Sequence, residues 1–560
     1  MIRSVAGVSD ATLDYVIIGA GPAGLQLAAL LEAAGDHDYL VLEAAQAPGA
    51  FFARFPRHRT LISINKPHTG SDDPELNLRM DWNSLLSDDP ALRFTRYTGR
   101  YFPDADVLVR YLADFAAATG VRARYGCRVT AVRRDGDGFA VETADGASLR
   151  ARAVVVATGV SLPYVPDVEG IELAERYDSV SVDPDDFTDQ RVLILGKGNS
   201  AFETADALME TTSAVHVAGP ESVRMAWRTH YVGHLRAVNN NFLDTYQLKS
   251  GNAVLDGTVR RIERDGDGYR VAFAFRRVDE VVKELRYDRI IVATGFRFDA
   301  SVLVGDARPD LAIGGRFPAL TAAFESVHVP GLLFAGTLTQ SRDFKPSTNG
   351  FIHGFRYGTR ALHRILARRF GGRDWPSTAL DAAPGPVADA IIARVNRSSG
   401  LWQQFGVLAD VVTVSGTGPS DTGPSDTGAS DSDARQARYH EEVPVAYLAE
   451  VGLDTPDHRV VDAFAVTLEY GPDHDQVDPF DVSVGRIAQD TPGQAHDAAY
   501  LHPVVRHHRD GAVVGVHHLA ENLENQWDRP DVHRAPLVDF LARSLAGSVG
   551  AGSAGREVGV

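Results

Sequence analysis

Two glycine-rich segments in this 560-residue chain have the spacing of turns that hold nucleotide phosphates. They are Gly19-x-Gly21-x-x-Gly24 and Gly196-x-Gly198-x-x-Ala201. In such turns the first glycine permits a tight turn, the second lets the backbone approach a pyrophosphate, and the third position allows close packing of helix on strand. Each turn would also present a helix N-terminus to the phosphates. Two nucleotides bound side by side would suit electron transfer between them.

An acidic residue follows only the first turn at the distance of a ribose-binding carboxylate. Glu43 follows that turn at about the 20-residue spacing at which a carboxylate accepts hydrogen bonds from an unphosphorylated ribose. The equivalent position after the second turn is Pro220, although Glu221 is adjacent and Arg224 and Arg228 follow. The first turn therefore predicts FAD or NAD. The second favours the 2′-phosphate of NADPH and leaves NADH open.

The segments around both turns have the order of strand, turn, helix and strand that a nucleotide-binding domain needs. The patterns predict strands 15–18, 39–42, 191–195 and 214–218, and helices 25–34 and 199 to about 211. A lone glycine motif can be an ordinary tight turn, but two in the same context make coincidence much less probable. The fold class that we predict is α/β, with two Rossmann-like dinucleotide-binding domains and a smaller α+β C-terminal region.

A further internal repeat supports two similar domains. Segment 134–139 recurs as 264–269, and both contain Asp-Gly pairs between β-like runs, which is a strong hairpin signal. Each predicted hairpin leads to an apolar strand that ends in Ala-Thr-Gly, at 157–159 and at 293–295. Small residues there would let the chain leave the sheet close to a nucleotide. An apolar strand at 332–334, followed by a helix, would return the chain to the first domain.

Length and composition predict at least three domains, because single cores stop growing at about 250–300 residues. We divide the chain into a first part of the FAD-binding domain (1–170), an NAD(P)H-binding domain (171–290), a return segment of the FAD-binding domain (291–375), a helical extension (376–412), a flexible low-complexity linker (413–434) and a C-terminal region of unknown role (435–560). The linker repeats Thr-Gly-Pro-Ser-Asp, which buries too little apolar surface to offset its ordering entropy. Histidines cluster between 502 and 518 without metal-ligand spacing, so we predict no metal site.

Charge and cysteine content exclude several classes of function. The formal charge of −18 and the pI near 5.5 argue against binding to nucleic acid or to anionic membranes. Cys127 is the only cysteine, which excludes a redox-active dithiol pair. No segment has the roughly 18 apolar residues of a membrane span, and segment 1–7 lacks the apolar core of a signal peptide, so we expect a cytoplasmic protein. Substrate and oligomeric state stay open.

Three longer motifs carry a family resemblance. They are 55–66, which begins Phe-Pro-Arg-His-Arg, 81–90, which begins Asp-Trp-Asn-Ser, and 350–357, which reads Gly-Phe-Ile-His-Gly-Phe-Arg-Tyr. With the two turns, they resemble the flavin-containing monooxygenase superfamily. They are more closely similar to the FAD-dependent oxidoreductase domain-containing protein 2 family, which includes the endoplasmic-reticulum flavoprotein associated with degradation.

The resemblance covers most of the chain and implies FAD in the first site and NADPH in the second. The NADPH domain would be inserted into the FAD domain, with hydride transfer from nicotinamide to flavin. In the superfamily the reduced flavin then reacts with O2 and oxygenates a nucleophilic or carbonyl substrate. Such chemistry belongs to the cofactor, and the protein supplies binding, orientation and exclusion of water.

The turns, the strand ends and the resemblance together give a set of site residues. The catalytic candidates are Asn65 and Asn83, of which Asn65 would lie near the reacting atom of the flavin; its alternative is a polar loop residue that satisfies backbone groups. The predicted cofactor-binding residues are Gly19, Gly21, Pro22, Ala23, Gly24, Glu43, Val129, Ala157, Thr158, Gly159, Gly196, Gly198, Asn199, Ser200, Ala201, Arg224, Ala293, Thr294, Gly295, Gly336 and Phe351. Further residues in motifs expected near the flavin are Arg57, His58, Trp82, His353 and Arg356.

One departure from the monooxygenase pattern leaves two hypotheses. Segment 168–178, which aligns with the fingerprint Phe-x-Gly-x-x-x-His, contains Gly170 but no histidine. That absence leaves nucleotide binding intact and counts against efficient monooxygenation. The first hypothesis is an NADPH-dependent flavin enzyme, either a monooxygenase or an oxidase that releases hydrogen peroxide. The second is a flavoprotein scaffold in which structural FAD supports the binding of a protein partner.

Overall fold

The computed structural model describes residues 12–35, 37–248, 250–276, 282–415, 436–454, 460–472, 474, 478, 481–488 and 491–546. These residues divide into two compact units. Unit 1 holds the described residues up to 69, residues 80–356 and residue 478; unit 2 holds residues 70–79 and the other described residues from 357 onwards. Both predicted nucleotide-binding domains therefore lie in unit 1, apart from residues 70–79 and 357–375 of the predicted FAD-binding domain, which belong to unit 2. Among the described helices, none has the length and hydropathy needed to traverse a lipid bilayer.

The first sheet of unit 1 has the strand order β3-β2-β1-β6-β5-β4, and β18 pairs with β6. Its parallel strands are β1 (Leu13–Ile18), β2 (Tyr39–Leu42), β3 (Ala123–Arg124), β6 (Ser148–Val156) and β18 (Leu332–Phe334). Its antiparallel strands are β4 (Val129–Asp135) and β5 (Gly138–Thr143), which continue from β6. The carboxyl ends of the parallel strands meet at one edge, where nucleotides bind in folds of this kind. The pairing of β18 with β6 confirms that the chain returns to the first domain.

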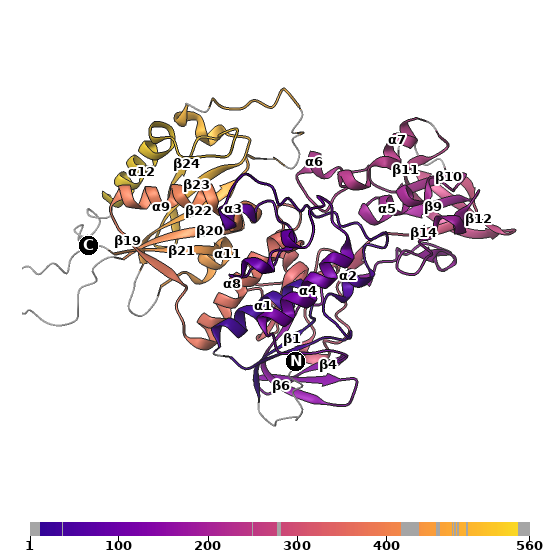
Figure 1. Ribbon diagram of the computed structural model, residues 1–560, viewed down its shortest axis with the longest axis horizontal. Coiled ribbons are helices and arrows are strands. Elements are labelled where there is room, and N and C mark those ends of the chain that lie inside the picture. The colour runs from indigo at the N-terminus through magenta and orange to yellow at the C-terminus, as the bar shows by residue number, and fades with distance from the viewer. Residues whose placement is uncertain are drawn as a thin grey trace, which may run out of the picture. The chain divides into compact units, whose positions relative to one another are not determined.

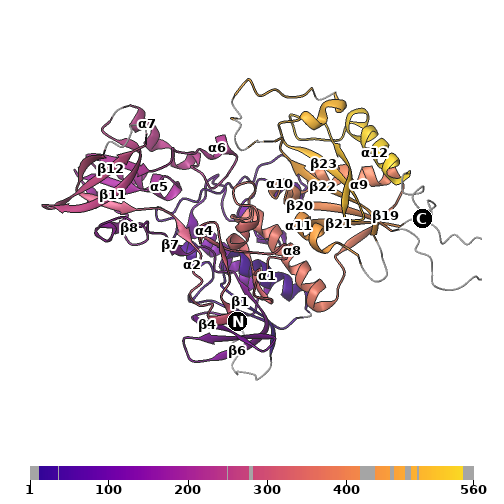
Figure 2. The same cartoon turned by 180° about the vertical axis from the view of Figure 1, so that it is seen from behind.

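Helices α1 (Pro22–Ala34) and α4 (Ala105–Thr119) lie together on one side of this sheet (Figures 1 and 2). Helix α1 is apolar around most of its circumference, because it is covered by both the sheet and α4. It ends at Gly35, whose φ of 68° is left-handed and suits glycine. The turn before α1 is therefore held between a buried strand and a buried helix.

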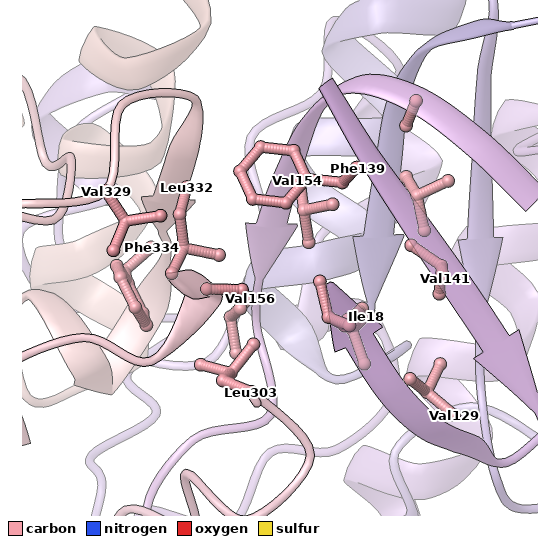
Figure 3. Close-up of a cluster of buried hydrophobic side chains, with 14 of the residues drawn as sticks. Ile18, Val129, Phe139, Val141, Val154, Val156, Leu303, Val329, Leu332 and Phe334 are labelled. Atoms are coloured by element: carbon pink, nitrogen blue, oxygen red, sulfur yellow. The ribbon is translucent and has the colours of Figure 1, made fainter. Parts of the chain in front are cut away.

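An apolar cluster on the strands of the same sheet forms the core of this domain (Figure 3). Val154 and Val156 lie on one face of β6, since alternate residues of a strand face the same side, and they pack with Ile18. Leu332 and Phe334 of the return strand complete the cluster. Burying each such side chain stabilises the fold by about 1.5–3 kcal/mol. The return segment is thus part of the core that positions the first turn.

The second sheet of unit 1 repeats this design, in the order β13-β12-β11-β10-β9-β14-β8. Its parallel strands are β8 (Glu175–Arg176), β9 (Arg191–Leu195), β10 (Ala214–Gly219), β11 (Ala253–Asp265) and β14 (Arg289–Val292); β12 (Gly268–Phe275) and β13 (Val282–Tyr287) continue antiparallel from β11. Helix α5 (Asn199–Leu208) follows β9 and ends three residues before the predicted end. The repeated segments 134–139 and 264–269 form the β4–β5 and β11–β12 hairpins, as predicted.

Unit 1 also has shorter elements outside these two sheets. They are α2 (Ala50–Arg54), α6 (Ala226–Thr229), α7 (Asn241–Gln247), β7 (Leu162–Pro163), β15 (Phe296–Arg297), β16 (Leu311–Ala312) and β17 (Phe317–Pro318). The predicted domain boundary at 290 falls inside β14, which pairs with β9 and β8. The chain therefore leaves the second sheet only after residue 292. Helix α8 (Ile352–Gly371) begins after the return strand, where the sequence predicts a helix.

Unit 2 contains a six-stranded antiparallel sheet in the order β19-β21-β20-β22-β23-β24. Its strands are β19 (Ser377–Asp381), β20 (Leu408–Ser415), β21 (Gln436–Pro444), β22 (Val460–Glu469), β23 (His502–Arg509) and β24 (Ala512–His518). Helices α9 (Pro384–Arg397) and α12 (Ala535–Ala546) pack against each other beside this sheet (Figure 1). Its remaining helices are α3 (Pro74–Asn77), α10 (Ser399–Gln403) and α11 (Val445–Val451).

The predicted helical extension, 376–412, is not a separate element. Strand β20 lies between β21 and β22, so the extension and the C-terminal region 435–560 share one sheet. The prediction fails because an apolar run such as 408–414 needs partners on both sides, and these partners follow much later in the chain. Residues 413–415 of the predicted linker belong to β20, and residues 416–434 lie outside the described residues.

Candidate active site

The three glycines of the first turn have different surroundings. A Cβ atom on Gly19, whose φ is 108°, would lie 2.9 Å from the carbonyl oxygen of Ala157, and one on Gly24 would lie 1.9 Å from the carbonyl oxygen of Gly19. A Cβ on Gly21 would meet no heavy atom within 4 Å. Gly21 is also the N-cap of α1 and receives no side-chain cap. Gly19 and Gly24 therefore serve close packing, whereas Gly21 leaves the backbone N–H groups of α1 open to a phosphate.

Glu43 is held beside the first turn by backbone hydrogen bonds. Its Oε2 atom accepts a hydrogen bond of 2.7 Å from the N–H of Ala20, and its Oε1 atom accepts one of 2.9 Å from the N–H of Ala45. The side chain is buried at the carboxyl end of β2. The carboxylate is thus fixed where the ribose next to a bound pyrophosphate would lie.

The second turn has the same division of labour. Gly196 has φ 128°, and a Cβ on it would lie 2.2 Å from the carbonyl oxygen of Ala293. A Cβ on Gly198 would meet nothing within 4 Å, and Gly198 is the uncapped N-cap of α5. Asn199 holds a loop across this helix end, because its Nδ2 donates to the carbonyl oxygen of His234 (2.8 Å) and its Oδ1 accepts from the N–H of Arg236 (3.0 Å). The two Ala-Thr-Gly strand ends therefore lie against the first glycine of each turn.

Each turn opens into a cavity, and the two cavities adjoin. The first cavity, at the first turn, has a volume of about 350 Å³, and the second cavity, at the second turn, has about 810 Å³. Both are lined by Phe51, Ile62, Val160, Asn199, Ser200, Phe296, Thr337, Gly350 and Phe351. Ligands in the two cavities would therefore meet across this shared wall.

Most predicted cofactor-binding residues line these cavities. Those that line the first cavity are Gly21, Pro22, Ala23, Ala157, Thr158, Gly159, Asn199, Ser200, Gly336 and Phe351. Those that line the second cavity are Gly196, Gly198, Asn199, Ser200, Ala293, Thr294, Gly295 and Phe351. Gly19, Gly24, Glu43 and Ala201 line neither cavity and support the turns from behind.

Val129 and Arg224 also line neither cavity. The side chain of Val129 is 8% exposed and belongs to the apolar core, pointing into the cluster with Val141 (Figure 3). Arg224 lies close enough to Lys345 for its charge to lower the pKa of that lysine, but only Lys345 reaches the second cavity. Neither Val129 nor Arg224 therefore presents its side chain to a ligand in the two cavities.

Neither of the two catalytic candidates is among the residues that line the cavities. The Nδ2 of buried Asn65 donates a hydrogen bond of 2.7 Å to the carbonyl oxygen of Thr98. The Oδ1 of buried Asn83 accepts one of 2.5 Å from the hydroxyl of Ser63. Ser63 lines the first cavity, so Asn83 helps to hold its wall in place. The Oδ1 of Asn65 is buried without a hydrogen-bond partner among the described residues. The catalytic role of both asparagines stays a prediction.

Aromatic rings and two nitrogen-bearing side chains form one wall of the first cavity. Trp82 stacks on His353 with 4.1 Å between the ring centroids, and the guanidinium of Arg236 lies 5.0 Å from the centroid of Trp82. His353 is 1% exposed, and neither of its ring nitrogens has a hydrogen-bond partner within the described parts of the chain. Burial, together with the charges of Arg356 and Arg236, holds the pKa of His353 well below its usual value. This imidazole is therefore neutral, with one nitrogen able to donate and the other able to accept.

The other three residues expected near the flavin lie outside the lining. Arg57 donates from Nη2 to the carbonyl oxygen of Val180 (2.7 Å), and the buried Arg356 donates from Nη1 to the carbonyl oxygens of Asp81 (2.9 Å) and Ser84 (2.8 Å). Burial and the charge of Arg57 lower the pKa of His58 to about 4. Arg356 thereby holds the loop that carries Trp82.

A tyrosine and a glutamate that the sequence did not assign also line the first cavity. The hydroxyl of Tyr177 donates to the carboxyl group of Glu203 and accepts a hydrogen bond of 3.1 Å from the N–H of Arg57. Burial raises the pKa of Glu203 to about 7, against the lowering effect of the Tyr177 hydroxyl. The signal was available, because Glu203 follows the second turn on the same helix face as Ser200, three residues away. Tyr177 has no comparable local signal.

Cationic side chains surround the second cavity. Arg316 and Lys345 line it, and Lys197 lines it while its Nζ bonds Asp256 (2.5 Å). The pKa of Lys345 is lowered by burial and by the charges of Arg224 and Arg316, which shows that these three cations lie close together. Such a cluster suits the phosphate groups of NADPH.

A sequence model of the pyridine nucleotide-disulphide oxidoreductase family matches residues 16–336. FAD-dependent oxidoreductase domain-containing protein 2 of Mus musculus is 39% identical, over 95% of this chain and 84% of its own length. The protein with the same name from Danio rerio is 36% identical, over 95% of this chain and 83% of its own length. The chain belongs to the FAD-dependent oxidoreductase domain-containing protein 2 family.

Part of this chain shares its fold with the solved structure of a flavin-containing monooxygenase from Stenotrophomonas maltophilia. That structure has a TM-score of 0.50 and 20% identity, and the match covers 64% of this chain and 98% of that chain. The predicted resemblance and fold class are therefore confirmed, and the protein binds FAD and NADPH.

The residues present fit both cofactors. Gly21 and the N-terminus of α1 leave open space for the pyrophosphate of FAD, with Glu43 fixed beside them for its ribose. Gly198 and the N-terminus of α5 leave the same space for NADPH. The one cysteine, Cys127, is 4% exposed, lies in the apolar core and lines neither cavity. The disulphide chemistry in the name of the matched family therefore has no counterpart in these cavities.

Proposed function

We propose that this protein is an NADPH-dependent flavin enzyme that delivers electrons to O2 in the first cavity, with oxygenation of a small organic substrate bound there. The observation that carries the proposal is the shared wall of the two cavities. When bound, NADPH supplies a hydride and FAD accepts it and passes the electrons on. The oxidase alternative, in which hydrogen peroxide leaves without oxygenation, uses the same site.

The chain's own contribution is to bring the two nucleotides together and to keep water away. The turns at Gly21 and Gly198 direct two helix N-termini into adjoining cavities. Phe51, Phe296 and Phe351 lie in the shared wall, and these apolar rings exclude water from the place where the hydride would move. A lone buried cysteine supports O2 rather than a protein dithiol as the outlet for the electrons.

Anaerobic reduction tests the proposal. FAD-loaded protein is mixed with NADPH or NADH without oxygen, and flavin absorbance is followed; NADPH is expected to bleach it, and admitted air to restore it. Hydrogen peroxide is then measured against NADPH consumed, since equal amounts identify an oxidase and a substrate-dependent deficit identifies oxygenation. A flavin that stays oxidised with both coenzymes contradicts the proposal and supports the scaffold hypothesis.

A further inference from the structure

Arg236 places a positive charge without a counter-charge in the wall of the first cavity. Within the described residues, its guanidinium forms no ion pair and donates no hydrogen bond. The guanidinium carbon lies 5.0 Å from the centroid of the Trp82 ring. Burial lowers its pKa, with only the Tyr101 phenol acting in the other direction. The more deeply buried Arg356 differs, because its Nη1 donates to two carbonyl oxygens. This half-buried guanidinium therefore presents an uncompensated positive charge to the cavity, which suits a negatively charged ligand.

His353 is a second polar group without a partner in the same wall. Its ring is 1% exposed, lines the cavity and stacks on Trp82, which places it next to the ring that Arg236 covers. Neither ring nitrogen has a hydrogen-bond partner in the described chain. Both nitrogens are covered by other atoms, so this imidazole gives the wall an uncharged aromatic surface and leaves Arg236 as its cation. A planar guanidinium has parallel N–H groups that match the two oxygens of a carboxylate.

The rest of the first cavity is largely apolar. Its hydrophobic lining includes Phe51, Phe55, Ile62, Phe296, Phe351 and Phe355. Glu203 is the one carboxyl group among the described lining residues, and its hydrogen bond with the Tyr177 hydroxyl engages it. The phosphates of both cofactors have their own positions at the N-termini of α1 and α5. The charge of Arg236 is therefore available to a third ligand.

We propose that the first cavity binds an apolar carboxylate, with the carboxylate on Arg236, beside the stacked rings of Trp82 and His353, and its aromatic or branched hydrocarbon part among the phenylalanines. The inference rests on the proposed function, since it names the substrate class of the same site. Binding itself needs only the FAD-loaded oxidised protein. Recognition of the carboxylate by the planar guanidinium would fix the hydrocarbon part at the flavin end of the cavity.

A pair of uncharged and charged probes tests this. FAD-loaded oxidised protein is titrated with 3-phenylpropionate and with 3-phenylpropionamide, and binding is measured by calorimetry and by the change in flavin absorbance. The carboxylate is expected to bind at least about 10-fold more tightly than the amide, the effect of one charge-assisted hydrogen bond. Arg236→Met should remove this preference, and Arg236→Lys should keep part of it.

Arg264→Met is the matched control, because Arg264 also stacks on an aromatic ring, Tyr269 at 4.7 Å, but on an exposed hairpin away from both cavities. It should keep the full preference. Wild-type protein that binds neither probe, or both equally, overturns the inference. An Arg236→Met variant that keeps the preference for the carboxylate also overturns the inference. If that variant in addition binds NADPH weakly, Arg236 serves the coenzyme instead of a third ligand.

The result is separable from that of the proposed function. Bleaching by NADPH is measured on the same preparations. Normal bleaching without carboxylate preference overturns this inference alone, and carboxylate preference without bleaching overturns the proposed function alone.

Discussion

Replacing Gly198 by alanine should weaken NADPH binding while leaving the fold and the FAD intact. The backbone of Gly198 is extended, with φ −96° and ψ −176°, which alanine adopts without strain. The added methyl group would meet no heavy atom of the protein within 4 Å. The thermal midpoint should therefore stay close to that of the wild type, because surface substitutions usually change stability by less than about 0.5 kcal/mol.

The same methyl group would occupy space that the coenzyme needs. Gly198 lines the second cavity and caps α5, so the methyl would stand between the helix N-terminus and an approaching pyrophosphate. Losing one charge-assisted hydrogen bond costs about 1.5–3 kcal/mol. The dissociation constant for NADPH should accordingly rise by about 10- to 150-fold.

Stopped-flow reduction provides the assay, with FAD content and thermal midpoint measured on the same samples. The rate of anaerobic flavin reduction is followed over a series of NADPH concentrations for wild type and Gly198→Ala. The mirror variant Gly21→Ala, which also meets nothing within 4 Å, should instead lose FAD. This pair separates the two cofactor sites by one methyl group each.

Two outcomes would refute the reasoning. If Gly198→Ala binds NADPH within twofold of wild type, the coenzyme does not approach this turn. If it loses FAD together with NADPH, the open space at Gly198 does not belong to a separate site. Gly196→Ala calibrates the method, because φ 128° and a 2.2 Å approach to the Ala293 carbonyl should destabilise the fold itself.

Three further predictions follow from buried charges. Burial raises the pKa of Asp343 from 3.8 to about 7, so the stabilising effect of its protonated form is complete below about pH 4 and is lost as the pH rises to about 7. Asp343→Asn should remove this pH dependence, which amounts to up to roughly 4 kcal/mol of unfolding free energy. The thermal midpoint of the variant should therefore change less between pH 5 and 7.5 than that of the wild type, and an unchanged slope would contradict the reasoning. Titration of the Glu203 carboxyl, whose pKa is about 7, should appear as a pH transition in the absorbance of flavin bound in the same cavity. Tyr177→Phe removes a hydrogen-bond donor to Glu203 and should move this transition to higher pH, whereas Glu203→Gln should abolish it. In unit 2, Glu442 is fully buried and pairs with Arg360, so Glu442→Ala should cost about 3–5 kcal/mol in scanning calorimetry, and an undisturbed transition would count against the pair.

Local sequence was sufficient wherever the structure depends on neighbours in the chain. Gly19 and Gly24 contact each other within one turn, and the β4–β5 and β11–β12 hairpins close through Asp-Gly pairs. The side chains of Asn65 and Asn83 could not be placed in this way. Their direction depends on a loop more than ten residues distant and on Ser63, so the motif gave their neighbourhood without their orientation.

The histidines of unit 2 show the same limit in a strand. Residues 502–509 look polar in sequence, yet they form β23 with buried side chains. His507 is buried because its Nε2 lies 2.7 Å from Asp462 on β22, and His502 because its Nε2 lies 2.9 Å from the Nδ1 of His518 on β24. Cross-strand partners satisfy these rings, and no pattern within the strand announces them.

The histidine missing from the monooxygenase fingerprint carries less weight once its segment is seen in three dimensions. The segment 168–178 contributes Tyr177 to the lining of the first cavity. Tyr177 reaches across from the end of β8 to Glu203 on α5, the helix whose N-terminus faces the second cavity. The same linker thus supplies a hydroxyl and engages a carboxyl group whose pKa lies near 7, where a histidine would titrate. The histidine position itself is Ala174, which packs against the apolar cluster of the second sheet, but three residues later the same segment brings a proton-bearing pair to the first cavity. The absent histidine alone is therefore a weak argument against oxygen chemistry in this cavity.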